Sequence, residues 1–284
     1  MEIEKICVLG AGAMGHGIAQ VCAQAGYQVN LEDIKDEFVQ KGIDRIRKFL
    51  DGSVELKRVA REEANATLGR ITGTTDLKEA AEDANLVIEA IAEDKEIKKE
   101  MFRQLDQLCP SHTIFASNTS FQCITEMAME TKRPEKFLGM HWFNPPQIMR
   151  GIEVIKAEKT SPEVVNTVAD LCKKLGKEPI ICKDSIGFIA NRIVLAWRTE
   201  CFSIYDEGIA SFRDIDKAFK EGYNFRMGPF EFTGLTGLDF AVHTTELIYQ
   251  ETRNDIFKPP QCLIRKARAG DFGRKTGRGF YEYK

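Results

Sequence analysis

The chain has 284 residues, about two domains of average size. Its composition, 43% hydrophobic and 29% charged, is that of a globular protein and excludes disordered and low-complexity classes. The net charge of −3 provides no basic excess for binding nucleic acid or acidic lipid.

The first feature along the chain is a run without formal charge from Ile6 to Leu31, long enough to span a bilayer. The run contains polar side chains and five glycines. It consists of an apolar strand at 6–9, a GxGxxG motif, helical spacing up to Gly26 and a second strand ending in Glu32. We therefore expect a strand–turn–helix–strand unit and no membrane span.

This motif predicts a dinucleotide site, and its residues are Gly10, Ala11, Gly12, Ala13, Met14 and Gly15. Gly10 permits the tight turn, Gly12 lets the backbone approach a pyrophosphate, and Gly15 allows close helix–strand packing. The pyrophosphate would lie on the free N–H groups of the helix N-terminus. Asp33 would accept hydrogen bonds from the adenosine ribose and, with Glu32, repel a 2′-phosphate. NAD is thus expected over NADP; the alternative is an ordinary βαβ unit with a flexible turn.

Helices and strands continue to alternate up to Lys183. We expect helices over 38–50, ending at Gly52, then to about Leu68, over 97–108 and over 161–176, and strands over 86–91, 113–116, 137–143, 152–155 and 179–182. This alternation predicts an α/β fold, a Rossmann-type doubly wound parallel sheet.

The alternation stops at Asp184, and a long helical pattern runs from Gly187 to Gly208. The prediction is a Rossmann domain over 1–183 followed by an all-helical domain over 184–284. Ligand sites favour such junctions, so we expect the substrate there.

Candidate chemistry lies where the strands end, because open α/β sheets bind ligands beyond the carboxyl ends of their strands. Ser120 and Asn144 follow two such strands, and His141 ends the second of them. Glu153 lies inside an apolar strand, where a carboxylate needs a partner. A His141–Glu153 pair would satisfy both groups and fix the imidazole tautomer. From the residues alone, His141 is equally consistent with a structural histidine and with a base.

A family resemblance is carried by motifs that cover nearly the whole chain. The chain resembles the short-chain L-3-hydroxyacyl-CoA dehydrogenase family, in particular its bacterial 3-hydroxybutyryl-CoA dehydrogenases. The motifs, in chain order, are GAGAMGHGIAQ, ITGTTDL, VIEAIAED, SNTS, GMHWFNPP, IEVIKA, GFIANRI, MGPFEF…GLD and GRKTGRGFYEY.

The resemblance implies an NAD-dependent oxidoreductase that interconverts (S)-3-hydroxybutyryl-CoA and acetoacetyl-CoA. His141 would be the general acid and base, Glu153 its partner, and Ser120 and Asn191 the groups that bind the substrate oxygen. The implied cofactor contacts beyond the glycine motif and Asp33 are Glu93, Lys98, Ser120, Asn144 and Lys275. The resemblance also implies a homodimer formed through the helical domain.

The acyl-CoA substrate needs cationic groups for its phosphates, and Lys57 and Arg58 are the candidates. Their alternative role is a solvated helix face. This segment also departs from the family, because many bacterial relatives have a denser lysine run here. Tyr223 and Phe225 would shorten an acyl pocket and favour a four-carbon chain, unless they are core residues. Further departures from the family are Gln147, more often Pro, and Gly234, commonly Asp.

Several alternatives remain open at this point. The chain could act on medium or long acyl chains, oxidise free hydroxy acids, or serve as an NAD-binding structural protein. The eight cysteines form no CxxC pair, and no signal peptide is evident, so we expect reduced thiols, no metal site and a cytoplasmic location.

Overall fold

The computed structural model describes residues 2–283, which form two compact units. Unit 1 ends at Phe188 and unit 2 begins at Ile189, a few residues after the boundary expected at Lys183. Each unit has its own apolar core and is described by itself.

Unit 1 is built around an eight-stranded sheet of order β3-β2-β1-β4-β5-β6-β7-β8. Neighbours from β3 to β6 are parallel, β6 and β7 are antiparallel, and β7 and β8 are parallel again. The strands are β1 Lys5–Leu9, β2 Gln28–Glu32, β3 Ile71–Thr74, β4 Leu86–Glu89, β5 Ile114–Ser117, β6 Phe137–Trp142, β7 Gly151–Lys156 and β8 Glu178–Lys183.

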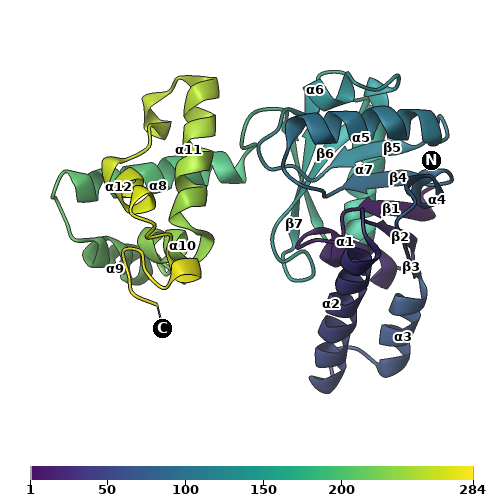
Figure 1. Ribbon diagram of the computed structural model, residues 1–284, viewed down its shortest axis with the longest axis horizontal. Helices are drawn as coiled ribbons and strands as arrows, with labels where there is room; N and C mark the ends of the chain where they lie inside the picture. Colours follow the sequence, from purple (N-terminus) through teal and green to yellow (C-terminus); the bar gives the residue numbers. More distant parts are fainter. Residues whose placement is uncertain (1, 284) are drawn as a thin grey trace. The chain divides into compact units, whose positions relative to one another are not determined.

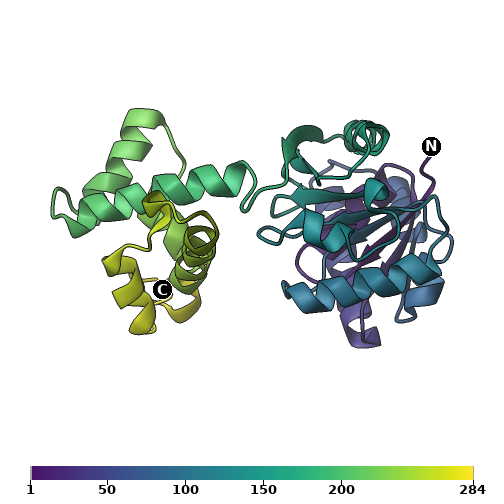
Figure 2. The ribbon, with the colours of Figure 1, turned by 90° about the horizontal axis from the view of Figure 1, so that it is seen from above.

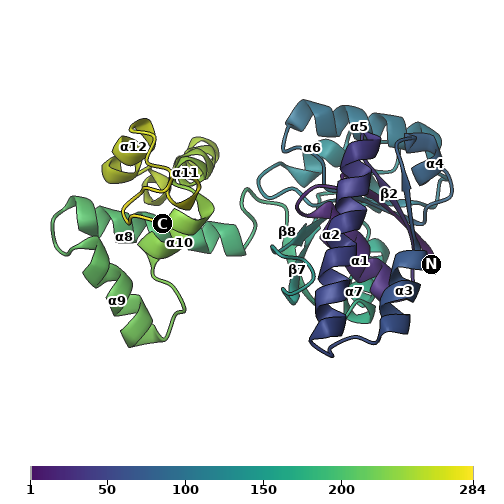
Figure 3. The same cartoon turned by 60° about the horizontal axis from the view of Figure 1, so that its bottom comes forward.

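Helices cover both faces of this sheet, and Figures 1 and 3 show the two groups. Residues of β1 alternate between the two cores: Ile6 and Val8 pack with one group of helices, Cys7 and Leu9 with the other. The first group is α1 Gly15–Gln24, α2 Asp36–Glu55, α3 Arg61–Gly69 and α7 Pro162–Lys174; the second is α4 Leu77–Ala81, α5 Lys95–Leu108 and α6 Ile124–Ala128. A short 3-10 helix, η1, spans Pro134–Lys136. The Rossmann-type fold is confirmed.

The run without charges forms β1, α1 and β2, as expected, and most of its apolar side chains are buried between sheet and helices. Gly15 begins α1 against the glycine turn, where an added Cβ would lie 1.6 Å from the carbonyl oxygen of Gly10. Within residues 2–283, no helix is both long and apolar enough to cross a membrane.

Three expectations about unit 1 need correction. The sheet is not wholly parallel: only the short connection 143–150 separates β6 from β7, and a parallel pair needs a crossover of about a dozen residues or more. Gly52 does not end α2, which continues to Glu55, because a glycine inside a helix costs only about 1 kcal/mol. The short elements β3, α4 and α6 were not predicted.

Unit 2 is helical, as Figure 2 shows. Its core joins Phe202, Phe230 and Leu238, with the rings of Phe202 and Phe230 stacked at 4.1 Å. The expected long helix is α8, which begins at Ala190. The elements are α8 Ala190–Asp206, α9 Phe212–Tyr223, α10 Pro229–Thr236, α11 Leu238–Thr252, α12 Gln261–Arg268, and the 3-10 helices η2 Asp255–Phe257 and η3 Arg274–Thr276.

Candidate active site

The glycine turn between β1 and α1 has the shape that a dinucleotide pyrophosphate requires. No atom lies within 4 Å of the position that a Cβ on Gly12 would occupy, so the backbone there borders open space. The first turn of α1 carries no acidic side chain, and its free N–H groups favour an anion. The residues present therefore fit a bound dinucleotide.

Asp33 ties this turn to the end of β2. Its two carboxylate oxygens accept the backbone N–H groups of Ala11 and Ile34, each at 2.8 Å. A carboxylate oxygen can accept more than one hydrogen bond, so Asp33 retains acceptor capacity for ribose hydroxyls.

Glu32, the neighbouring residue, is buried with 4% of its surface exposed. Burial, together with the adjacent negative charge of Asp33, raises the pKa of the Glu32 carboxyl to about 7. The end of β2 therefore carries a buried carboxyl, Glu32, whose ionisation is disfavoured near neutral pH.

The structure brings His141, Glu153 and Ser120 together. His141 on β6 lies directly opposite Glu153 on β7, and its Nδ1 is 2.6 Å from Glu153 Oε2. Its Nε2 is 3.1 Å from Ser120 Oγ. His141 and Glu153 are both buried, and the rings of Phe143 and Phe188 flank the imidazole at 5.1 and 5.6 Å.

This network assigns the imidazole tautomer. An ionised carboxylate is only an acceptor, so Nδ1 carries the hydrogen that Glu153 accepts. Nε2 then carries no hydrogen, and it can accept a hydrogen bond from the Ser120 hydroxyl. A neutral imidazole held in this way is ready to take a proton at Nε2.

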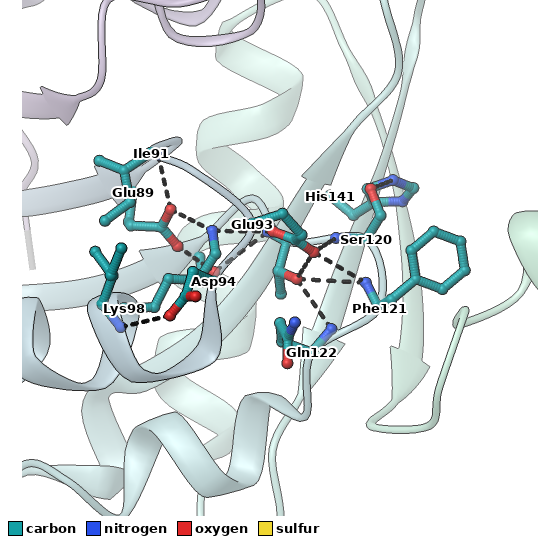
Figure 4. A network of polar contacts seen from close by, with 12 residues as sticks. Glu89, Ile91, Glu93, Asp94, Lys98, Ser120, Phe121, Gln122 and His141 are labelled. Carbon is teal, nitrogen blue, oxygen red and sulfur yellow. Dashed lines mark hydrogen bonds and ion pairs between the residues drawn. The ribbon is translucent and has the colours of Figure 1, made fainter. Parts of the chain in front are cut away.

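The turn that carries Ser120 is held by several polar contacts, and Figure 4 shows those that Glu93 makes. Asn118 Oδ1 accepts the backbone N–H of Trp142 at 2.9 Å, which joins the turn to β6. Glu93 Oε1 accepts the hydroxyl of Thr119 and the backbone N–H of Ser120, the latter at 3.1 Å. Burial alone would raise the pKa of Glu93, but Lys98 and these hydrogen bonds outweigh it and lower that pKa.

Lys98 lies inside the protein, with 1% of its surface exposed. Its Nζ is 2.5 Å from Glu89 Oε1 and 3.1 Å from Glu93 Oε2. The ammonium group thus contacts two carboxylates, of which Glu93 is partly exposed and Glu89 is fully buried.

The remaining predicted residues, two of which belong to unit 2, take no part in the hydrogen bonds and ion pairs described above for His141, Glu153, Ser120, Glu93 and Lys98. Asn144 is exposed in the turn after β6, and Lys57 and Arg58 are exposed just after α2. Asn191 lies in the first turn of α8 in unit 2. Lys275, also in unit 2, pairs with Asp239. Their roles stay predictions.

Sequence reasoning missed Glu89 and Ser117, which join the same network. Glu89 Oε2 accepts the Ser117 hydroxyl at 2.5 Å, and Oε1 accepts the N–H of Ile91 at 2.9 Å. The signal was present, because Glu89 interrupts an apolar strand just as Glu153 does.

Comparison with known families now identifies the chain. Residues 5–185 match the model of the 3-hydroxyacyl-CoA dehydrogenase NAD binding domain, and residues 187–283 match that of the C-terminal domain of the same enzymes. The chain belongs to the 3-hydroxyacyl-CoA dehydrogenase family. This family consists of NAD-dependent enzymes, so the predicted family, enzyme class and cofactor are confirmed.

Individual relatives agree with this assignment. The chain is 40% identical to a probable 3-hydroxybutyryl-CoA dehydrogenase of Bacillus subtilis, over 100% of this chain and 98% of the relative. It is 39% identical to the mitochondrial hydroxyacyl-coenzyme A dehydrogenase of Sus scrofa, over 99% of this chain and 92% of that protein. The crystal structure of (S)-3-hydroxybutyryl-CoA dehydrogenase from Ralstonia eutropha matches with a TM-score of 0.97 and 37% identity, covering all of both chains.

Proposed function

We propose that this member of the family interconverts (S)-3-hydroxybutyryl-CoA and acetoacetyl-CoA, with His141 as the general acid and base. The observation that carries the proposal is the array of partly buried Ser120 with buried His141 and Glu153, with contacts of 3.1 and 2.6 Å. The names of the Bacillus subtilis and Ralstonia eutropha relatives support the four-carbon substrate.

In the oxidative direction, neutral His141 accepts the proton of the substrate 3-hydroxyl at Nε2. Glu153 accepts the Nδ1 hydrogen and stabilises the imidazolium that forms. In the reductive direction the protonated imidazole returns the proton to the carbonyl oxygen. General acid–base catalysis of this kind is typically worth about 10²–10⁴-fold in rate.

Ser120 orients the reacting oxygen, because its hydroxyl already contacts His141 Nε2. We assign Asn191 to the same oxygen by family resemblance. The turn residues 10–15 and Asp33 would hold the dinucleotide, with Glu93, Lys98, Ser120, Asn144 and Lys275 as further candidate contacts. When bound, NAD supplies the hydride acceptor, and NADH the hydride donor, for C3 of the substrate.

The rest of the proposal concerns substrate and assembly. Lys57 and Arg58 would contact the CoA phosphates. Comparing the binding of CoA esters with that of dephospho-CoA esters at two salt concentrations would test these contacts. We further propose a cytoplasmic enzyme that forms a homodimer through unit 2, where Ile193 on α8 and Ile209 after it are more than half exposed. Sedimentation analysis would show a single monomeric species if the dimer proposal is wrong.

The substrate proposal is tested by measuring kcat/KM for acetoacetyl-CoA, 3-oxooctanoyl-CoA and free acetoacetate with NADH. We expect acetoacetyl-CoA to give the highest value and free acetoacetate to give no measurable turnover. A higher value for the eight-carbon ester would move the enzyme to the medium-chain class. Efficient turnover of free acetoacetate would favour a hydroxy-acid dehydrogenase instead.

A further inference from the structure

A buried ion pair lies behind the Ser120 turn, on the side away from His141 (Figure 4). Glu89 is the last residue of β4, and Lys98 lies in the first half of α5. Their exposed fractions are 0% and 1%, and Nζ and Oε1 are 2.5 Å apart. The proposed chemistry uses neither residue.

This pair contacts the Ser120 turn at both of its ends. At the start of the turn, Glu89 accepts the Ser117 hydroxyl, and Ser117 Oγ in turn accepts the backbone N–H of Thr119 at 3.2 Å. At the far end, Lys98 holds Glu93 at 3.1 Å, and Glu93 accepts the backbone N–H of Ser120. The contacts therefore run in two branches from the ion pair: one ends at Thr119, and the other reaches Ser120, the residue beside His141, through Glu93.

Thermodynamic stability does not explain such a pair. Removing two charges from water costs more than their attraction commonly returns, and an apolar pair of similar volume is often at least as stable. Conformational specificity is the better explanation here. An ammonium group between two carboxylates fixes both of them, and each carboxylate fixes one end of the turn.

We propose that Glu89 and Lys98 are positioning residues that hold the Ser120 hydroxyl on His141 Nε2 by fixing the turn 117–121 through Ser117 and Glu93. This inference rests on the proposed function, because it gives Ser120 a role in the reaction. It gives Lys98 a second role, in addition to the cofactor contact that family resemblance implies. Its ammonium group is enclosed by its two carboxylate partners.

The test uses the full-length double variant Glu89→Gln/Lys98→Met, which removes both charges together and leaves neither one buried alone. The matched control is Lys99→Met/Glu130→Gln, a partly buried pair that also involves α5 and is 3.3 Å apart. We expect kcat of the first double variant to fall about 10- to 100-fold, since small misplacement of reacting groups has effects of this size. We expect KM for NADH to rise by a smaller factor than kcat falls, and the control to keep wild-type kcat.

A thermodynamic cycle with Ser120→Ala shows whether the pair acts through Ser120. If it does, adding the double substitution to Ser120→Ala lowers kcat less than about threefold further. Full additivity would overturn the proposal, and so would wild-type kcat in the double variant. A raised KM for NADH with unchanged kcat would also overturn it, in favour of direct cofactor contact by Lys98.

A second measurement does not depend on activity. Hydrogen exchange of the Thr119 and Ser120 amides should be about tenfold or more faster in the double variant than in the wild type or the control. If the wild-type protein does not reduce acetoacetyl-CoA, the proposed function fails, but this exchange rate still decides whether the ion pair fixes the turn. Unchanged exchange would overturn the positioning role.

Discussion

His141 and Glu153 meet because β6 and β7 run antiparallel and place these two residues in register. Neither group could remain buried alone without a large desolvation cost. Their contact satisfies both, and it leaves His141 Nε2 as the one ring nitrogen directed at Ser120. At the scale of single residues, the Glu153 carboxylate thus sets the orientation of the His141 imidazole, whose Nε2 is the proposed proton acceptor.

The substitution Glu153→Gln tests that orientation. The amide preserves the size of the side chain but removes the charge that stabilises the imidazolium, so we expect kcat to fall about 10²–10⁴-fold with little change in KM for NADH. Steady-state kinetics over a pH range would measure this effect. Exposed Glu158, just past β7, provides the control Glu158→Gln. An unaltered kcat and pH profile in Glu153→Gln would restrict Glu153 to a structural role.

The carboxyl ends of β1, β2, β4, β5 and β6 carry most of the polar groups of the candidate site, as expected for an open α/β sheet. At the end of β2, ionised Glu32 lowers the free energy of unfolding, because this carboxyl is buried beside Asp33. The pKa of Glu32 is raised in the folded state, so this residue favours folding at low pH. That contribution is lost as pH rises from the ordinary value near 4.5 through about 7.

We therefore predict that Glu32→Gln stabilises the protein above neutral pH and has little effect in acid. From the raised pKa of Glu32, the gain in free energy of unfolding is on the order of 3 kcal/mol at about pH 8. Urea denaturation at about pH 5 and about pH 8 measures it, with the exposed Glu55→Gln as control. An equal effect at both pH values would mean that the buried charge is not the cause.

The sequence predicted most elements of unit 1 and the residues next to His141, but not β3, α4 or α6. The helical spacing of α5 and the apolar run of β6 are strong local signals, whereas β3 has the largely polar sequence ITGT with no fully buried residue, and α4 has only five residues. The direction of β7 was accessible from the short connection before it. The apolar run around Glu89 indicates that this carboxylate needs a partner, but its partner Lys98 comes from another element, and only the folded structure identifies it.

At the scale of the whole molecule, departures from the family pattern have local explanations in two cases. A Cβ on Gly234 would lie 1.8 Å from the Tyr283 hydroxyl, so the position is filled by that tyrosine and has no room for Asp. The amide of Gln147 lies against Gly17 and contacts Gln20 on α1 at 3.3 Å.

Tyr223 is 73% exposed and Phe225 48%, which excludes them from the core of unit 2. Their availability to an acyl chain is part of the four-carbon proposal.

The most direct test of the central claim is acetoacetyl-CoA-dependent oxidation of NADH, followed for the wild-type protein and for His141→Ala. We expect steady turnover by the wild type and a loss of about 10²–10⁴-fold in kcat for the variant, because His141 moves the proton. NADH binding should remain nearly intact. The account would be contradicted by a wild-type protein that does not oxidise NADH with acetoacetyl-CoA, or by His141→Ala with unchanged kcat.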